Sequence, residues 1–422
     1  MRPQSTALAL VLAAGSGSAQ SVIWTVDDGG GPGVAFTEIQ PAVNAAGEGD
    51  TIFVRDGAYT GFTIDGKSLV VAGELGGTVL VVDEQIVVRN LAAGQFVLLQ
   101  GIDVEGGLSP FLAGQPALLA ENDQGIVRVE DGSFLPSAAL NVGGGVWIDG
   151  SAAVHLARCD LLGGQAGFFP PGQDGFPALD VFDGTAALYD CDLEGAFGPG
   201  GGCTLGCGPG VQAGSGSVLD DSFLFASGGS IAGGDGGPGA APCSLLGPGG
   251  DGGDGGNGLH LLTPGTDAFT LGTPILAGTG GPAHPASPCS SGSNGVAVQV
   301  DAGTYQPVGL AARSLSVTSP VSSGATITVD GVGAGGDTVF LLVSGSPGHL
   351  VLPALFGVLT TDLNFFPIPL GLLPPSGAFS LSVPTVPVPP SGVALHLFLQ
   401  TVSVAATGEI VLGSFATLVL LT

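Results

Sequence analysis

Acidic residues recur at matching positions of a repeated sequence in the middle of the chain, and one arginine lies among them. Two sets of positions carry them, the first with Asp103, Asp160 and Asp192 and the second with Arg158, Asp190 and Asp220. If the repeats stack as parallel strands, matching residues lie about 5 Å apart. Carboxylates at that spacing can bind calcium or act as an acid–base pair on a sugar.

Arg158 beside Asp190 offers the chemistry that a polysaccharide lyase requires, because a basic group must remove the proton next to a uronate carboxylate. If the protein is an enzyme, we therefore expect Arg158, Asp190 and Asp220 to be its catalytic residues. The alternative is that Arg158 and Asp190 form a surface ion pair where a strand ends. We favour this second interpretation, which predicts no catalytic residues.

Two features of the sequence resemble parts of a calcium site. Asp160 and Asp192 would stack on neighbouring repeats, and Gly252–Leu259 approximates the calcium nonapeptide G-G-x-G-x-D-x-U-x, with Asp254 at a variable position and Asn257 replacing the aspartate. Such sites need several stacked nonapeptides, and this chain has one. We expect no cofactor, with calcium at Asp160, Asp192 or Asp254 as the open alternative.

Gly61–Ser68 fits the phosphate-binding pattern G-x-x-x-x-G-K-S, but its context does not. That loop must follow a buried strand and open a helix, so that its amides face phosphate. Here the next residues, Leu69–Gly73, have the composition of a strand, and we expect no nucleotide. The five histidines form no H-E-x-x-H motif, and His155 and His396 lie in strand patterns, which indicates structural roles.

The composition indicates strands and turns rather than helices. The chain has 78 glycines and 31 prolines among 422 residues, and only 10% of its residues are charged. A mean hydropathy of +0.52 excludes a disordered chain, and the scarcity of Lys, Glu and Arg disfavours a helix-rich enzyme. A net charge of −28 excludes nucleic acid and anionic membrane surfaces as partners.

A repeat of about thirty residues organises the first three quarters of the chain. Its two apolar positions are filled by Leu99, Val129, Leu156, Leu188 and Val218, and by Val104, Phe134, Leu161, Leu193 and Phe223. A second strand is predicted before the last three copies, at 145–150, 178–184 and 210–214. Short strands that cannot bury their apolar faces alone form a solenoid when they stack.

Glycine-rich insertions separate the later copies, at 163–177, 195–209, 228–258 and 278–295. Insertions that recur at one point of a repeat lie on one face of a solenoid. Their G-G-x motif permits close backbone packing, as in polyproline II chains. The alternative, which we favour, is a flexible fringe of loops.

The N-terminal residues carry a resemblance to a known fold. The segments 36–46, 49–54, 56–59 and 67–73 contain F-T-E-I-Q-P-A-V-N-A-A, G-D-T-I-F-V, D-G-A-Y and K-S-L-V-V-A-G. They resemble the opening of right-handed parallel β-helix proteins of the pectate-lyase-like superfamily, in which an amphipathic helix caps the first coil and a G-D-T-I strand follows. The resemblance spans about residues 22–300 and implies the fold but not an activity, because that superfamily holds lyases, hydrolases, adhesins and inert scaffolds.

Both ends of the chain differ from the repeat. Residues 1–19 have the weak positive start, short apolar core and small-residue cleavage site of a secretory signal peptide. Residues 305–422 contain alternating strands at 314–317, 325–329, 337–343, 377–383, 393–400 and 415–421, which predicts a β-sandwich. This part resembles a C-terminal β-domain found on many secreted bacterial proteins. No segment has the length of a membrane span.

Six cysteines in an exported chain allow three disulfides in fifteen pairings. Cys159 and Cys191 occupy one position on successive coils, where the Cα separation suits a disulfide, and the alternative is a ladder of reduced thiols in the core. We favour the bridge. For the others, we expect the pairs Cys243 with Cys289 and Cys203 with Cys207.

The sequence therefore predicts an all-β bacterial protein, secreted or on the cell surface: a right-handed parallel β-helix over residues 20–304, with coils of about 30 residues, followed by a β-sandwich. We expect a structural or adhesion protein without catalytic activity that binds extracellular polysaccharide along the flank of the helix. The alternative is a polysaccharide lyase or glycoside hydrolase. A third hypothesis is a calcium-stabilised surface-layer component.

Overall fold

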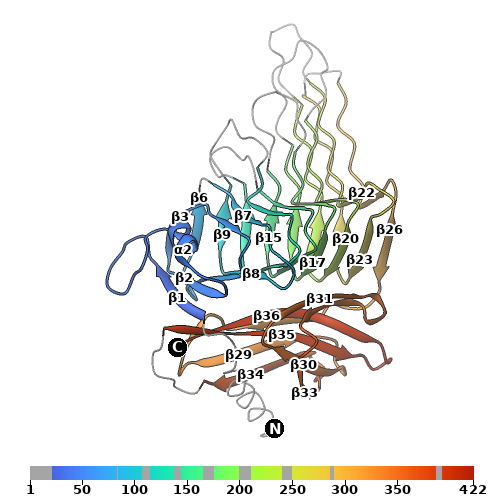
Figure 1. The fold of residues 1–422 in the computed structure, drawn as a ribbon. Coiled ribbons are helices and arrows are strands. Elements are labelled where there is room, and N and C mark those ends of the chain that lie inside the picture. The colour runs from blue at the N-terminus through green and yellow to red at the C-terminus, as the bar shows by residue number, and fades with distance from the viewer. Residues whose placement is uncertain are drawn as a thin grey trace.

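The computed structural model describes residues 21–82, 84–106, 115–136, 144–164, 175–198, 211–239, 250–285, 289–385 and 392–422 (Figure 1). Within them the chain is all-β, and short strands stack in parallel sheets, as a parallel β-helix requires. No helix in these ranges is long and apolar enough to cross a membrane. The predicted signal peptide, residues 1–19, lies outside the described residues.

Three parallel sheets form the stack, which occupies most of the chain. Sheet I contains β1 (Ser21–Val26), β2 (Asp50–Val54), β5 (Leu69–Gly73), β8 (Phe96–Gln100), β11 (Ile126–Glu130), β14 (Ala153–Ala157), β17 (Thr185–Tyr189), β20 (Phe223–Ser227), β23 (Asp267–Leu271) and β26 (Thr304–Val308). Sheet II contains β4 (Thr63–Asp65), β7 (Ile86–Arg89), β10 (Leu118–Glu121), β13 (Val146–Asp149), β16 (Leu179–Phe182), β19 (Ser217–Asp220), β22 (Leu259–Leu261) and β25 (Val298–Val300). Sheet III contains β3 (Gly57–Thr60), β6 (Val79–Val82), β9 (Asp103–Glu105), β12 (Ser133–Leu135), β15 (Asp160–Leu162), β18 (Asp192–Glu194), β21 (Ser230–Ala232) and β24 (Ile275–Leu276).

The strand register confirms the first four copies of the predicted repeat and corrects the fifth. The two apolar ladders run through Leu99, Val129, Leu156 and Leu188, and through Val104, Phe134, Leu161 and Leu193. The next members are Ala226 and Ile231, rather than Val218 and Phe223. Val218 instead pairs with Asp180 in sheet II, and the strand predicted at 210–214 is absent from its described part, 211–214.

Turns with a left-handed residue join sheet I to sheet III in the coils from β8–β9 to β23–β24. The positive φ angles fall at Gly101, Asp131, Arg158, Asp190, Gly228 and Gly272. A second set of such turns joins sheet II to sheet I, at Gly66, Asn90, Asn122, Gly150, Asp183 and Asp221. Asn and Asp tolerate this conformation better than most residues, which accounts for part of the regular spacing of acidic residues in the sequence.

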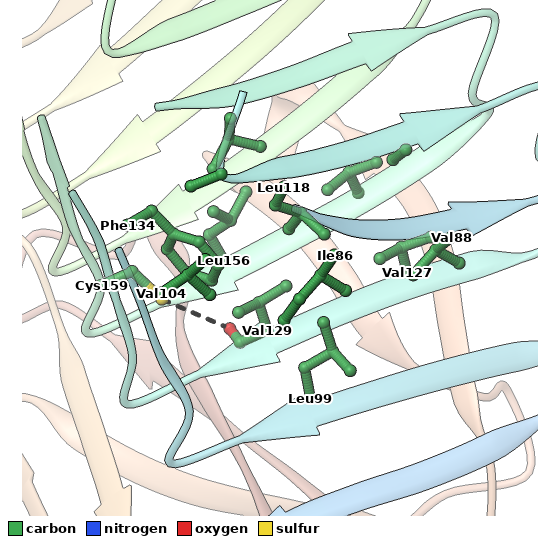
Figure 2. Close-up of a cluster of buried hydrophobic side chains, with 14 of the residues drawn as sticks. Ile86, Val88, Leu99, Val104, Leu118, Val127, Val129, Phe134, Leu156 and Cys159 are labelled. Carbon is green, nitrogen blue, oxygen red and sulfur yellow. Dashed lines mark hydrogen bonds between the residues drawn. The ribbon is translucent and has the colours of Figure 1, made fainter. Parts of the chain in front are cut away.

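Aliphatic ladders from all three sheets fill the core of the stack (Figure 2). In the view of Figure 2, Ile86 and Leu118 of sheet II face Leu99 and Val129 of sheet I, and Phe134 of sheet III lies to their left, beside Val104 and Leu156. Each of these side chains is at most 1% exposed. Burial of one such side chain stabilises the fold by about 1.5–3 kcal/mol, so the stacked coils supply the main stabilisation.

The N-terminal end of the stack is covered by the short helix α2 (Ile39–Ala45), which buries Ile39, Ala42 and Val43. The helix and the G-D-T-I strand β2 lie where the superfamily resemblance implied them. Lys67, from the segment that fits the phosphate-binding pattern, donates from its Nζ to the carbonyl oxygens of Val43 and Ala46. It therefore satisfies the C-terminal carbonyls of α2, and the residues after it form strand β5.

The glycine-rich insertions are ordered in their described parts, contrary to the flexible fringe that we favoured. They form two layers of extended segments beside the stack (Figure 1). The outgoing layer, which leaves sheet III, contains 195–198, 233–239 and 277–284, and the returning layer, which enters sheet II, contains 175–177, 211–216, 250–258 and 289–297. Backbone hydrogen bonds join segments within a layer, such as Gly236 N to Thr279 O at 2.7 Å, and between layers, such as Gly256 N to Gly234 O at 2.8 Å.

The close approach of these segments explains the G-G-x motif. A Cβ atom on Gly253 would lie 1.9 Å from the carbonyl oxygen of Val211, and one on Gly256 would lie 1.9 Å from that of Gly214. Only glycine fits at such positions, as at the crowded positions of bundled polyproline II chains. The third residues of these triplets, such as Asp235, Asp254 and Asn257, are exposed or half-buried.

The C-terminal part continues sheet I and adds further strands. Strands β28 (Val321–Ser322), β30 (Thr338–Ser344), β33 (Phe366–Leu372), β35 (Val393–Val404) and β36 (Ile410–Leu421) extend sheet I, because β35 pairs with β1. Strands β27 (Ser314–Val317), β29 (Thr326–Val332) and β34 (Ala378–Pro384) form a second, antiparallel sheet. Strands β31 (Pro347–Leu352) and β32 (Gly357–Thr361) pair around the short helix η2 (Pro353–Leu355).

These C-terminal sheets share a core of their own. Leu315, Ile327 and Val383 of the antiparallel sheet pack with Leu341, Leu397 and Leu418 of the extended sheet. All six strands predicted after residue 305 are present, as β27, β29, β30, β34, β35 and β36. Strands β28, β31, β32 and β33 were not predicted.

Candidate binding face on sheet II

The outer faces of the three sheets have different surroundings. The C-terminal strands cover sheet I (Figure 1), where the hydroxyl of Tyr189 donates to the carbonyl of Val358 over 3.0 Å. Sheet III carries small and acidic side chains on strands of two to four residues, including Ser133, Asp160 and Asp192. Sheet II carries outward-facing aromatic residues.

Trp147 of β13 and Phe182 of β16 point away from the core, since their neighbours Ile148 and Val181 are buried inside it. Phe182 is 52% exposed. The Trp147 ring lies 6.0 Å, centroid to centroid, from the ring of Phe176, which precedes β16 in the returning layer. The indole N–H of Trp147 is buried without a hydrogen-bond partner.

Three carboxylates adjoin these rings. In the strand register Asp180 lies beside Trp147, while Asp149 and Asp220 lie on either side of Phe182. Burial, helped by the charges of Asp220 and Asp149, raises the pKa of Asp180 to about 6. A carboxyl group that titrates there accepts hydrogen bonds when ionised and can donate a proton near neutral pH.

Arg158, the predicted lyase base, lies away from this face in a turn between sheets I and III. Its Nε donates to Asp131 at 2.6 Å and its Nη2 to Glu130 at 3.1 Å, while its Nη1 donates to the carbonyls of Leu315 and Phe415 at 2.8 and 2.9 Å. A guanidinium that donates through every nitrogen does not suit removal of a proton from a substrate. Arg158 instead joins the stack to the C-terminal strands, so it also differs from the simple surface ion pair that we favoured.

The other two predicted catalytic residues are separated from each other. Asp190 occupies the turn equivalent to that of Arg158 on the next coil, and burial raises its pKa above the ordinary value. Asp220 ends β19 in sheet II, where it joins Asp149 and Asp180. The sequence aligned Asp220 with Asp190 because the fifth copy of the repeat was placed out of register.

Two of the three calcium candidates, Asp192 and Asp254, accept hydrogen bonds from the protein. Ser230 Oγ donates to Asp192 at 2.6 Å, and burial, followed by the charge of Asp192, raises the pKa of Asp160. Asp254 Oδ1 accepts from the backbone N–H of Ser293 at 2.6 Å. No group of three or more metal-binding side chains occurs within the described ranges. Asp254 thus holds two segments of the returning layer together.

The predicted bridge between Cys159 and Cys191 is wrong, because both thiols are free and buried. They do lie at one position on adjacent coils, next to the paired residues Asp160 and Asp192. Each thiol faces a carbonyl of its own coil, Ala157 O for Cys159 and Tyr189 O for Cys191, both at 3.4 Å. Burial raises the pKa of the Cys159 thiol well above its ordinary value, which keeps it protonated.

Cys289 is disulfide-bonded. Its predicted partner Cys243 and the predicted pair Cys203 and Cys207 lie outside the described residues, so these pairings stay predictions.

The sequence contained a signal for the residues of this face that was not used. Strands at 145–150 and 178–184 were predicted from alternation, and alternation places Trp147, Asp180 and Phe182 on the side opposite the buried residues. The matching acidic positions of the repeat point instead to Arg158 and Asp190, which lie in turns between sheets I and III.

The chain matches no protein-family model and no curated protein. The geometry of the sheet II face therefore carries the argument about function.

Proposed function

We propose that this protein is a secreted bacterial protein of the right-handed parallel β-helix kind, with a C-terminal β-sandwich, that binds an extracellular polysaccharide on sheet II without cleaving it. It would act at the cell surface as a structural or adhesion protein. The observation that carries the proposal is an aromatic surface, formed by the half-buried Trp147 and the exposed Phe182, beside carboxylates that form no ion pair within the described residues.

The chemistry of a sugar fits this surface. The apolar face of a sugar ring packs on an aromatic ring, and ionised carboxylates accept hydrogen bonds from sugar hydroxyls. Because Asp149, Asp180 and Asp220 concentrate negative charge there, anionic polyuronides are repelled, and neutral or cationic polysaccharides are the expected ligands. Neighbouring strands about 4.8 Å apart offer further contacts along a polymer.

Binding should be measured with mature protein, residues 20–422, on a panel of neutral, cationic and anionic polysaccharides. We expect Trp147→Ala to weaken binding at least tenfold. Phe182→Ala should weaken binding as well, and its matched control is Phe366→Ala, which removes from β33 in the C-terminal part a ring that is 53% exposed, against 52% for Phe182. Equal binding by wild type, Trp147→Ala, Phe182→Ala and Phe366→Ala would place the ligand elsewhere, and absence of binding to every polymer would reject the glycan proposal.

A second candidate function, glycoside hydrolysis, is favoured by one observation. The pKa of about 6 at Asp180 suits a general acid, and Asp149 and Asp220 sit diagonally across neighbouring strands from it. On parallel strands that diagonal separates the Cα atoms by about 8 Å, and carboxyl groups at a similar separation would suit an inverting glycosidase. New reducing ends on any polymer, lost in Asp180→Asn, would favour this function over simple binding.

A further inference from the structure

The interface between sheet I and the C-terminal strands encloses three of the five histidines. His155 of β14 is fully buried, and its Nε2 lies 2.8 Å from Nδ1 of His349 on β31. Elsewhere in the same interface, His396 of β35 lies with its Nε2 2.9 Å from Thr51 Oγ1 of β2. His260, by contrast, is on sheet II and contacts Asp301.

The contact between His155 and His349 requires a neutral ring. One nitrogen must donate and the other accept, so two imidazolium ions cannot form this hydrogen bond. Their rings lie 5.1 Å apart with planes 27° from parallel, which would bring two positive charges face to face. The second nitrogen of His155, Nδ1, is buried without a partner, so a proton added there would find no acceptor.

The groups around His155 do not compensate a positive charge. On β11, Arg128 lies beside His155 in the register and is itself fully buried. The carboxylate of this network, Glu130, already accepts from Arg128 at 2.7 Å and from Arg158 at 3.1 Å. On β17, Tyr189 presents a neutral hydroxyl, and β36 presents the rings and backbone around Phe415.

We propose that this interface is an acid-sensitive latch, in which neutral His155, His349 and His396 hold the C-terminal strands on sheet I and their protonation releases that cover. Each part keeps a core of its own, so release requires parting of the two-residue pairing between β1 and β35 and of the interface contacts, but not unfolding of either core. An apolar cluster that includes Tyr189, Val358 and Phe415 opposes release at neutral pH. Release exposes the outer face of sheet I, on which Arg128, Glu130 and the Tyr189 hydroxyl lie among apolar side chains such as Leu98 and Phe225.

The direction of the pH response follows from proton linkage. Burial lowers the pKa of His349 and of His396 to about 4, and burial, His349 and Arg128 lower that of His155 well below its ordinary value. In the open form these rings return to a pKa near 6.5. The closed form then binds fewer protons between pH 6.5 and 4, so acid favours opening. For His349 and for His396, the difference in pKa between the open form (about 6.5) and the closed form (about 4) changes the equilibrium between these two forms by about 300-fold.

Hydrogen exchange on the mature chain tests the latch between pH 7 and 4. The amides of Thr417 and Val358 donate across the interface, to Glu130 at 2.9 Å and to Tyr189 at 3.2 Å. After correction for intrinsic rates, we expect their protection to fall at least 100-fold as the pH falls. Amides of β14 inside the stack should keep theirs. Equal loss of protection in β14 would mean global unfolding and would overturn the proposal.

Variants assign the effect to the histidines. His349→Phe and His155→Phe should each reduce the pH response at Thr417 and Val358 by at least tenfold. His349 belongs to the C-terminal strands and not to the stack, so His349→Phe keeps the test valid if His155→Phe fails to fold. His260→Gln, outside the interface, should respond like wild type. A wild-type response in His349→Phe, or a reduced response in His260→Gln, would contradict the latch.

Discussion

Two outward faces of the same stack use charged residues in opposite ways. On sheet I, Arg128 and Glu130 are fully buried under the C-terminal strands, and Glu130 accepts from two arginines and from Thr417. On sheet II, Asp180 and Phe182 face outward with no such cover. An outward position in the repeat therefore does not decide a residue's role. The element packed on that position decides it.

The covered face specifies how the two parts dock. Replacing a buried ion network by apolar residues of similar volume often costs little stability, whereas removing one partner leaves an uncompensated charge. Arg128 also lies 3.9 Å from the centre of the Phe415 ring, which adds a cation–π contact to the network. We infer that Glu130 and its two arginines set the register between sheet I and β36.

The largest effect is expected from Glu130→Ala, which leaves the buried Arg128 without a carboxylate and removes one of the two acidic partners of Arg158. We expect it to lower the free energy of unfolding by about 3–5 kcal/mol. Chemical denaturation of the mature chain measures this. The control Glu121→Ala removes the partner of Arg89 in a surface pair at 3.6 Å and should change stability little. If Glu130→Ala and Glu121→Ala lowered the free energy of unfolding by similar amounts, the buried network on sheet I would be no more important for stability than a surface ion pair.

A smaller effect of opposite sign is expected from Asp180→Asn on the open face. An acid whose pKa rises from 3.8 to about 6 on folding loses stability as the pH rises through that window. The full shift equals about 3 kcal/mol, and partial exposure reduces it to about 1–2 kcal/mol. Asp180→Asn should therefore be more stable than wild type at pH 7 and equal to it at pH 3.5. Denaturation midpoints at the two pH values measure this, and a difference that persists at pH 3.5 would contradict the assignment.

The smallest effects concern the returning layer that leads into sheet II. Asp254→Asn keeps the acceptor for Ser293 N–H and should leave the melting temperature unchanged, whereas Asp254→Ala should cost about 1 kcal/mol. Thermal melts with calcium and with a chelator check the competing calcium hypothesis. A melting temperature that falls on chelation in wild type but not in Asp254→Asn would show that Asp254 binds the ion.

The features that could be predicted from the sequence are those that depend on residues close together along the chain. The ladders from Leu99 to Leu188 and from Val104 to Leu193 followed from alternation, because each strand must bury alternate residues. The predicted register of the fifth copy is wrong, because the glycine-rich segment 211–214 also alternates and resembles a strand. For the same reason Asp220 was assigned to the wrong sheet, and the open face was not recognised.

The sequence alone determined the all-β class, the stacked repeat and most of the C-terminal strands, because these depend on local alternation and turn residues. Only the tertiary structure decided what covers each face. Packing of residues more than a hundred positions apart turned Arg158 into a docking residue and buried Arg128 and Glu130 beneath the C-terminal strands. Those outcomes depend on contacts between distant segments, on which the spacing of residues along the chain carries no information.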